Sequence, residues 1–399
     1  MSNKLTIEKI AVIGIGGVFP DAPETQSYWK NILDKKISIG PVCEQNFDRK
    51  AHFDPDVYGK SDKNDKSYTE IGSSTISLNF DGLKFRIPPA TARHMDENQK
   101  AILLSVEEAM KMVDSSRWNR DKVSVFMGAS LGGPLHYSFL RRINLNRCLY
   151  YLENSPEFKE LSESKRAKVI SDIENEIRSG TFTITEDSAP GVLPNIVASR
   201  VAATFDFHGH AYTIDAACAS SLAAVINGVQ HLTSGESDVV ICGAADLLNG
   251  EFGRIYFSGI NALSPDGSFP FDTRANGFVI GEGAGAVILK RLSDAVADGD
   301  AILCTIIGYG HNSDGKGKSI AAPNFRYQAK AIQQAIEMSM VPAETIELIE
   351  AHGTSTAVGD KSEIDALKLA FENTGVKTKQ FCAVGSAKSN IGHLKTAAG

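Results

Sequence analysis

The sequence predicts an α/β protein whose buried strands alternate with amphipathic helices. Short apolar, β-branched runs recur along the 399 residues, and stretches of helical period lie between several of them. The composition, 42% hydrophobic and 22% charged, is that of a globular protein with a large core. Apolar runs without polar alternation are typical of strands buried on both faces. We expect strands over residues 10–13, 123–126, 212–214, 239–242, 286–289, 302–307 and 346–349.

The clearest helix is predicted over residues 97–113. Its apolar residues recur every three or four positions and form one stripe along the helix, made of Ile102, Val106, Ala109, Met110 and Val113. Such a stripe packs against a sheet or another helix. We therefore interpret it as core and not as a cofactor site.

Residues 144–179 differ in character from the apolar regions on either side. They are rich in Glu, Lys, Arg and Ser, most densely over residues 157–168. We expect a helical excursion or cap on the surface. Its charges are interpreted as a solvated face and not as a dedicated partner site.

The charge balance argues against nucleic acid as a partner. Lys and Arg total 41 against 48 Asp and Glu, a formal net charge of −7, whereas phosphate binding needs a basic surface. Residues 1–9 are polar, and no apolar run approaches the roughly 18 residues of a membrane-spanning helix. We therefore expect a cytoplasmic protein without a membrane span.

The cysteines predict neither a metal site nor a disulfide framework. They lie far apart without a C-x-x-C pair, and isolated cysteines are usually small buried side chains. The six are Cys43, Cys148, Cys218, Cys242, Cys304 and Cys382.

Cys218 differs from the other cysteines because it is expected at a strand-to-helix turn. The strand over residues 212–214 precedes it, and a helix follows whose apolar stripe is predicted to be Leu222, Val225, Ile226 and Val229. The positive end of the helix dipole and the free N–H groups there favour a thiolate. Small neighbours leave room for a substrate, although the motif alone also fits a buried structural cysteine.

Two histidines are expected in glycine-flanked turns. His352, in Glu-Ala-His-Gly-Thr-Ser-Thr, directly follows the strand predicted over residues 346–349, and α/β proteins bind ligands at the carboxyl ends of strands. His393, in Lys-Ser-Asn-Ile-Gly-His, follows Val384-Gly385 and precedes a helix start. Each motif alone also fits a histidine held by local hydrogen bonds.

Taken together, the three segments resemble the β-ketoacyl synthases, in which a D-x-A-C-x-S-S cysteine, an E-A-H-G-T-x-T histidine and a K-S-N-I-G-H histidine occur in this order. Residues 10–14 and 271–283 extend the resemblance, which covers essentially the whole chain. Four segments are most similar to synthases of polyketide and polyunsaturated fatty acid megaenzymes: residues 194–200, 205–207, 313–319 and 322–323.

The resemblance implies a thiolase-like α/β/α/β/α layered fold of two similar halves. Residues 1–254 would form the half with the nucleophile, and residues 255–399 an incomplete half with both histidines. It also implies a decarboxylative Claisen condensation, in which an acyl group on cysteine is joined to a malonyl-type extender. The acyl substrates would be carried on the 4′-phosphopantetheine of an acyl carrier protein. A homodimer with neighbouring megasynthase domains is expected, without a metal ion or a directly bound cofactor.

The resemblance also assigns roles to single residues. Cys218 would carry the acyl group, and His352 and His393 would donate hydrogen bonds to the extender's thioester oxygen. Lys388 and Glu363 match positions that orient the histidines from behind. The pantetheine arm would be hydrogen-bonded by Thr354 and Thr356.

Some residues depart from the family's pattern. Ser355 replaces the glycine usual between the two threonines, and residues 361–362 stand where a proline often follows Asp360. A Gly-Phe-Gly loop of the family, which supplies an oxyanion-hole N–H, would lie beyond Gly399. We therefore expect a fragment of a longer polypeptide.

Three alternatives compete with this interpretation. Residues 128–132 satisfy the G-x-S-x-G pattern of a serine hydrolase or acyltransferase with Ser130 as nucleophile, although Gly133-Pro134 is expected to interrupt the helix it needs. Residues 14–19 partly match a nicotinamide-binding loop, but Phe19 occupies the third glycine position. The last alternative is a non-catalytic partner of the thiolase fold, which usually lacks the reactive cysteine that is present here.

Overall fold

The computed structural model describes residues 8–44, 46–74, 78–317 and 322–399, so most of the polar start of the chain lies outside it. Its centre is a six-stranded mixed sheet with the order β5-β4-β6-β7-β1-β8. β5, β4 and β6 run parallel, and β6, β7, β1 and β8 alternate in direction. The strands are β1 (Ile10–Val18), β4 (Val123–Gly128), β5 (Ala211–Ile214), β6 (Val239–Asp246), β7 (Gly283–Arg291) and β8 (Cys304–Ile306). Each strand expected here from an apolar run is present.

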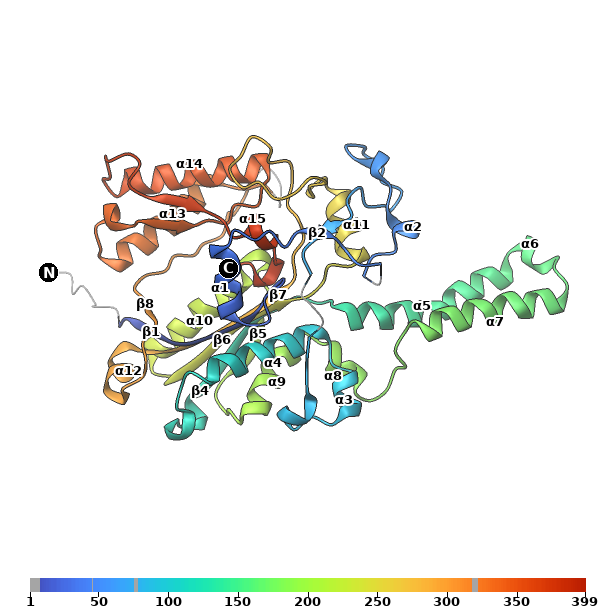
Figure 1. Cartoon of the computed structure of the whole chain (residues 1–399), viewed down its shortest axis with the longest axis horizontal. Helices are drawn as coiled ribbons and strands as arrows, with labels where there is room; N and C mark the ends of the chain where they lie inside the picture. The colour runs from blue at the N-terminus through green and yellow to red at the C-terminus, as the bar shows by residue number, and fades with distance from the viewer. Residues whose placement is uncertain (1–7, 45, 75–77, 318–321) are drawn as a thin grey trace.

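Helices cover both faces of this sheet (Figure 1). On one face, α4 (Glu97–Met110) and α9 (Asn195–Phe205) form a continuous core with the inward side chains of the sheet. The predicted stripe of α4 is confirmed, since Ile102, Val106 and Ala109 are fully buried and Met110 packs against the same cluster. α10 (Ser220–Ser234) packs on the opposite face.

The glycines of β1 have a packing role. A Cβ atom at Gly16 would lie 2.0 Å from the carbonyl oxygen of Ser105, and one at Gly14 would lie 2.7 Å from that of Ala109. The glycines therefore allow the α4 backbone to lie directly against the sheet. This requirement explains the partial G-x-G match in the sequence without a nucleotide.

The buried face of α10 differs from the predicted stripe. Val229 is buried as expected, but Leu222 is 55% exposed, and the packed face includes Ala224, Gly228 and Leu232. The reason is a close helix–sheet approach, because a Cβ atom at Gly228 would lie 2.5 Å from Sγ of Cys242. Small residues make that approach possible, so the stripe of large apolar residues did not identify the packed face.

The last part of the described chain, after β8, forms a smaller unit. Its parallel strands β9 (Leu348–Glu350) and β10 (Ala383–Gly385) form a separate sheet, and α13 (Phe325–Ser339) packs against α14 (Ala357–Asn373) through a small alanine-rich core. α15 (Lys388–Ile391) follows β10 and leads to the end of the described chain. The strand expected over residues 346–349 is present as β9.

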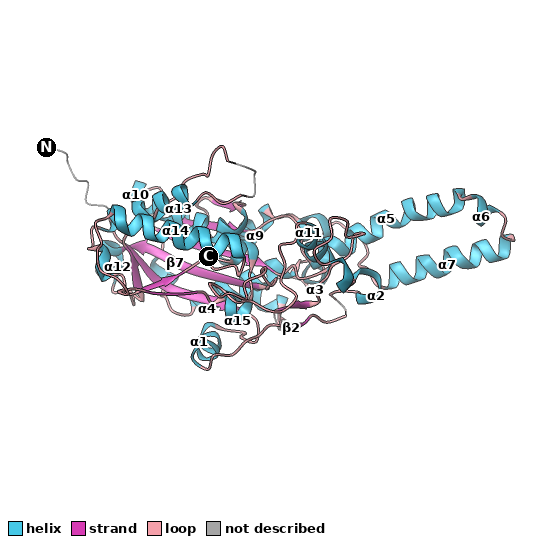
Figure 2. Ribbon diagram, turned by 90° about the horizontal axis from the view of Figure 1, so that it is seen from above, coloured by secondary structure: helices cyan, strands magenta, loops and turns pink. Residues whose placement is uncertain are grey.

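A helical arm projects from the body of the molecule (Figures 1 and 2). It consists of α5 (Pro134–Asn154), α6 (Pro156–Lys159) and α7 (Glu163–Ser179), and every side chain of α7 is at least partly exposed. The predicted surface excursion is confirmed. It begins earlier than expected because Pro134 starts α5, a position where the missing N–H of proline costs nothing.

The remaining elements are short and lie around this framework. None of the helices in the described ranges has the combined length and apolar character that crossing a bilayer requires. The elements are α1 (Thr25–Leu33), β2 (Gly40–Pro41), α2 (Arg49–His52), β3 (Ile71–Gly72), α3 (Pro89–Arg93), α8 (Ser188–Val192), α11 (Glu251–Gly259) and α12 (Leu292–Asp298).

Candidate active site

Cys218 lies in a tight turn between β5 and α10, as predicted. A single 3₁₀ turn, Ala217–Ala219, contains it, and Ala217 adopts a left-handed conformation with φ of +51°. Side chains fix this uncommon backbone: Asp215 accepts from the N–H of Ala217 at 3.0 Å, and the Ser220 hydroxyl donates to its carbonyl at 2.7 Å. Hydrogen bonds with these two side chains therefore stabilise the strained backbone of the turn. Strained backbone of this kind is common at functional sites.

His352 lies in the turn that leaves β9. The carboxylate of Glu363, on α14, accepts hydrogen bonds from the backbone N–H groups of His352 and Gly353 at 2.7 and 2.8 Å. Glu363 thus holds the turn through its backbone and not through the imidazole. The expectation that Glu363 lies behind the histidine agrees with this position.

His393 lies in the turn that follows α15, where both its backbone and its ring are hydrogen-bonded. Its backbone N–H donates to the carbonyl of Val279 at 2.7 Å, and its carbonyl accepts from the N–H of Gly281 at 2.9 Å. The ring atom Nδ1 accepts from the N–H of Lys395 at 2.9 Å. Because Nδ1 is an acceptor there, the neutral ring carries its proton on Nε2, which is left as a donor.

The three predicted residues meet at one place although they come from three distant segments. Sγ of Cys218 and one ring nitrogen each of His352 and His393 all lie within 4.8 Å of one another. The two imidazoles meet edge to face, with centroids 5.2 Å apart. Cysteine and histidine also bind zinc, so this set is chemically able to hold a metal ion as well as a substrate.

The surroundings keep both histidines neutral. Desolvation, helped by the Lys388 cation, lowers the pKa of His352 to about 4, although the residue as a whole is exposed. Burial lowers the pKa of His393 well below its ordinary value, and His352, Lys388 and Lys395 add to the effect. Near neutral pH both rings are therefore hydrogen-bond donors without a positive charge.

The pKa of the Cys218 thiol is shifted in the direction opposite to the one that the sequence predicts. Burial raises its pKa, while the Lys388 and Lys395 cations act in the opposite direction. The predicted preference for thiolate was therefore wrong in its net direction, because removal from water disfavours the charged form more than the neighbouring cations favour it. The cations still make this site more favourable for a thiolate than burial alone would.

The remaining predicted residues lie next to the cluster. Lys388 is buried on α15, and burial lowers its pKa while Glu350 and Glu363 raise it. Thr354 and Thr356 follow His352, and their hydroxyl oxygens are 3.0 Å apart.

Sequence reasoning missed a buried ion pair beside His393. Asp246, the last residue of β6, lies 3.0 Å from Nζ of Lys395, and Lys395 also donates to the carbonyl of Gly281 at 3.1 Å. The hydroxyl of Thr396 is 3.1 Å from the same aspartate. The sequence feature that could have indicated this pair is an acidic residue at the carboxyl end of a buried strand.

Comparison with known proteins identifies the family. Residues 7–295 match the family described as "Beta-ketoacyl synthase, N-terminal domain", and residues 303–399 match its C-terminal domain. The chain belongs to the β-ketoacyl synthase family. The resemblance inferred from the cysteine and histidine motifs is confirmed.

Similar proteins include large multidomain synthases. This β-ketoacyl synthase chain is 34% identical over its full length to polyketide synthase PksM of Bacillus subtilis, and covers 8% of that protein. It is 32% identical over 98% of its length to one component of the polyunsaturated fatty acid synthase of a Thraustochytrium species, and covers 14% of it. The chain therefore spans only a small part of these relatives.

Solved ketosynthase structures confirm the thiolase-like layered fold. An oxazolomycin ketosynthase domain of Streptomyces albus superposes with a TM-score of 0.80 at 27% identity. A ketosynthase from module 6 of the bacillaene synthase of Bacillus subtilis gives 0.77 at 30% identity. Each comparison covers 98% of this chain, and 60% and 59% of the respective solved chains.

The serine that replaces a glycine is accommodated by its hydroxyl. Ser355 is fully buried in a left-handed conformation with φ of +64°, where glycine is normally favoured. Its hydroxyl oxygen accepts from the N–H of Phe269 at 2.9 Å, while Asp360 accepts from the N–H groups of Ser355 and Phe271. The substitution thus adds a contact between the His352 turn and the loop after α11.

The serine-hydrolase alternative is not supported. Ser130 does lie between β4 and α5, but residues 129–133 are not helical and α5 begins only at Pro134, so the helix that the elbow needs directly after the serine is missing there, as expected from Gly133-Pro134. Within the described ranges, no hydrogen bond joins Ser130 to a histidine. The part of the chain that the structure describes therefore offers the G-x-S-x-G serine no hydrogen-bonded histidine as a base.

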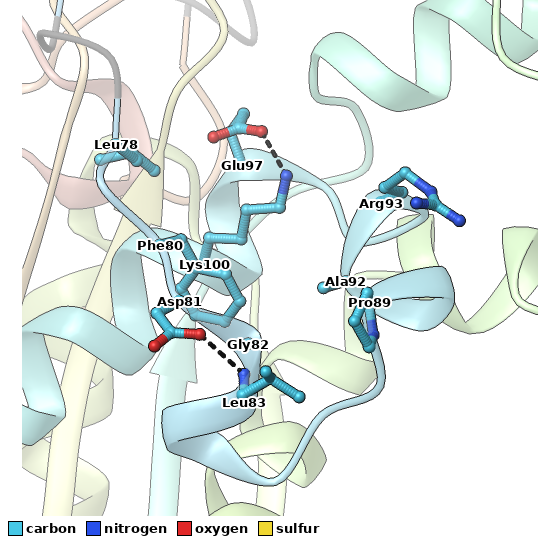
Figure 3. Close-up of a pocket in the computed structure, with 10 residues that line it drawn as sticks. All are labelled: Leu78, Phe80, Asp81, Gly82, Leu83, Pro89, Ala92, Arg93, Glu97 and Lys100. Atoms are coloured by element: carbon cyan, nitrogen blue, oxygen red, sulfur yellow. Dashed lines mark hydrogen bonds and ion pairs between the residues drawn. The ribbon is translucent and has the colours of Figure 1, made fainter.

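A separate hollow of about 460 Å³ lies beside α3 and the start of α4 (Figure 3). Its lining comes from residues 78–100 alone, including Phe80, Asp81 and Arg93. On one side of the hollow, Nζ of Lys100 lies 2.6 Å from Oε1 of Glu97 in the preceding turn of α4. The hollow shares no residue with the cluster of Cys218 and the two histidines.

Proposed function

We propose that this chain is the condensing domain of a polyketide or fatty acid synthase and catalyses a decarboxylative Claisen condensation. The observation that carries the proposal is the convergence of Sγ of Cys218 with a ring nitrogen of each neutral histidine. A nucleophile beside two uncharged N–H donors suits acyl transfer followed by enolate formation.

In the first step, the Cys218 thiolate attacks the carbonyl carbon of an acyl thioester on a carrier protein. The new C–S bond to Sγ forms as the bond to the carrier's pantetheine sulfur breaks. The departing thiolate takes up the proton that the Cys218 thiol has lost. Lys388 and Lys395 assist this step because their charges favour the thiolate.

In the second step, a malonyl-type extender on a carrier protein loses its carboxylate as CO₂. The electron pair of the broken C–C bond passes into an enolate, whose oxygen accepts hydrogen bonds from His352 and His393. The enolate carbon attacks the acyl carbonyl on Cys218, a C–C bond forms, and Cys218 leaves as thiolate. Neutral rings suit this role, since they donate without giving up a proton.

The surrounding residues have supporting roles in the proposal. Lys388 and Glu363 position the histidine turns, with Glu363 holding the backbone of His352. Thr354 and Thr356 hydrogen-bond the pantetheine arm of the substrate. Reaction at Cys218 needs neither a metal ion nor a directly bound cofactor.

The partners follow from the same chemistry. We propose that an acyl carrier protein delivers the acyl substrates and that neighbouring megasynthase domains belong to the same protein. We also propose that the protein forms a homodimer, lies in the cytoplasm and does not bind nucleic acid. Light scattering after gel filtration tests the homodimer, and cell fractionation tests the location.

Intact-protein mass spectrometry tests the nucleophile. The complete protein is incubated with an acyl-carrier thioester, and we expect one acyl group per chain, lost in Cys218→Ala. Cys43→Ala is the control, because Cys43 is exposed and outside the cluster. Undiminished acylation in Cys218→Ala would show that another residue is the nucleophile.

A further inference from the structure

A second cluster of potential metal ligands lies outside the active site, at the edge strand of the main sheet. His210 directly precedes β5, His231 lies in the last turn of α10, and Glu236 follows that helix. One ligand atom of each residue lies within 4.8 Å of the others. The three are separated along the chain but brought together because β5 and α10 flank the same turn.

The contact between His231 and Glu236 is close without being a hydrogen bond. Nδ1 of His231 lies 3.0 Å from Oε2 of Glu236, yet this buried nitrogen has no hydrogen-bond partner in the described part of the chain. The carboxylate oxygen is therefore off the direction of the ring's N–H. Zinc–ligand bonds of about 2.0–2.1 Å place neighbouring ligand atoms roughly 3.3 Å apart in a tetrahedral site. The observed separation is close to that value.

The other ring nitrogen of His231 already faces a polar group. The Tyr212 hydroxyl lies 3.5 Å from Nε2, which leaves Nδ1 as the ligand atom. Metal-binding histidines usually place their second nitrogen against a polar partner in this way. Nε2 of His210 lies 3.9 Å from the same oxygen of Glu236, its side chain is 57% exposed, and its ring meets that of His231 edge to face with centroids 4.9 Å apart.

The backbone around the cluster is held in place. The N–H of His210 donates to the Ser124 hydroxyl at 3.0 Å, which ties it to β4. Lys122 donates to the carbonyls of Gly235 and Glu236 at 3.0 and 3.4 Å, so the loop after α10 is fixed as well. Binding would require adjustment of side chains and not of the fold.

We propose that His210, His231 and Glu236 bind a divalent cation of the zinc type. Two imidazoles and a carboxylate suit zinc, and the exposure of His210 and Glu236 leaves room for water as a fourth ligand. The ion joins the start of β5 to the end of α10, the two elements on either side of the Cys218 turn. Its role is to stabilise this unit.

Zinc binding is measured in a Cys218→Ala background, because Cys218 and its two histidines are the other potential site. Titration against a chromophoric chelator is expected to find one equivalent of Zn²⁺ that survives gel filtration. His210→Ala and Glu236→Gln, both at exposed positions, should weaken this binding at least tenfold. His208→Ala is the matched control, since His208 is an exposed histidine that pairs with Asp206 at 3.1 Å.

Thermal unfolding gives a second readout that does not depend on activity. Added Zn²⁺ should raise the melting temperature by a few degrees in the background and in His208→Ala, but not in His210→Ala or Glu236→Gln. Equal zinc binding in all four proteins would overturn the proposal. Absence of a retained zinc equivalent in the background would also overturn it and leave a simple histidine–carboxylate contact.

Discussion

At the scale of single residues, the geometry of the proposed active site depends on the hydrogen bonds that hold three turns. Asp215 and Ser220 fix the turn of Cys218, Glu363 fixes that of His352, and the N–H of Lys395 sets the tautomer of His393. The reactive atoms are thus placed by hydrogen bonds to the backbone. Such preorganisation is what donor sites for a developing negative charge require.

Substitution of the histidines should separate acyl transfer from decarboxylation. His352→Ala and His393→Ala in the complete protein are expected to retain acylation of Cys218 but to release CO₂ from malonyl carrier protein about 10²- to 10³-fold more slowly, because each removes a donor to the enolate oxygen. A radiolabelled CO₂ assay measures the loss. His311→Ala is a control at an exposed position.

Two outcomes would contradict these roles. Normal decarboxylation in either variant would remove that histidine from the donor role. Loss of acylation with decarboxylation intact would instead make it the base that activates Cys218.

The pH dependence of Cys218 reactivity should depend on Lys388. Its cation opposes the rise in the thiol pKa that burial causes. Lys388→Met should therefore shift the pH midpoint for alkylation of Cys218 upward and slow alkylation near neutral pH. The exposed Lys361→Met, which removes a pair with Asp365, serves as control. An unchanged or lower midpoint in Lys388→Met would show that its charge does not act on the thiol.

At the scale of elements, close packing of helices on the main sheet positions the Cys218 turn. α4 lies against β1 through glycines, and α10 lies against β6 through Ala224 and Gly228. The arm of α5 to α7 is different, because it projects from the body and packs largely on itself. The two kinds of helix should respond differently to substitution.

Ile102→Ala tests the packing of α4. The side chain is fully buried between α4 and the sheet, so its truncation should lower the free energy of unfolding by about 2–5 kcal/mol. Lys111→Ala, at the exposed end of the same helix, should change it by less than about 0.5 kcal/mol. Urea unfolding followed by circular dichroism measures both. A loss below about 1 kcal/mol for Ile102→Ala would contradict the assignment of this stripe to the core.

At the scale of the whole molecule, the site is assembled where the main sheet meets the smaller unit. Cys218 lies in the turn that follows β5 of the main sheet, and His352 follows β9 of the small sheet. His393 bridges back to residues 279–281, next to β7. The division after residue 254 remains a prediction.

The Asp246–Lys395 pair should contribute to this assembly. Both side chains are largely buried, so Asp246→Asn leaves an unpaired buried charge and should cost about 3 kcal/mol of unfolding free energy. The double variant Asp246→Asn/Lys395→Met should recover part of that loss, which a double-mutant cycle measures. If the two single substitutions were simply additive, the pair would not be coupled.

Local sequence patterns predicted the strands of the main sheet, the surface character of the arm and the residues at the three turns. They also predicted most of α4, although the helix expected over residues 97–113 ends at Met110. These depend on patterns within about ten residues, such as apolar period and turn chemistry. The cysteine and histidine motifs also identified the family. Their meeting within 4.8 Å agrees with that assignment.

Properties that depend on contacts between distant segments could be read only from the folded chain. The raised pKa of Cys218 comes from burial set against two lysines near the chain's end, and the packed face of α10 comes from its close approach to β6. The Asp246–Lys395 pair and the His210 cluster join residues that have no local signal in common. Burial and contact are properties of the folded chain, so a local pattern cannot carry them.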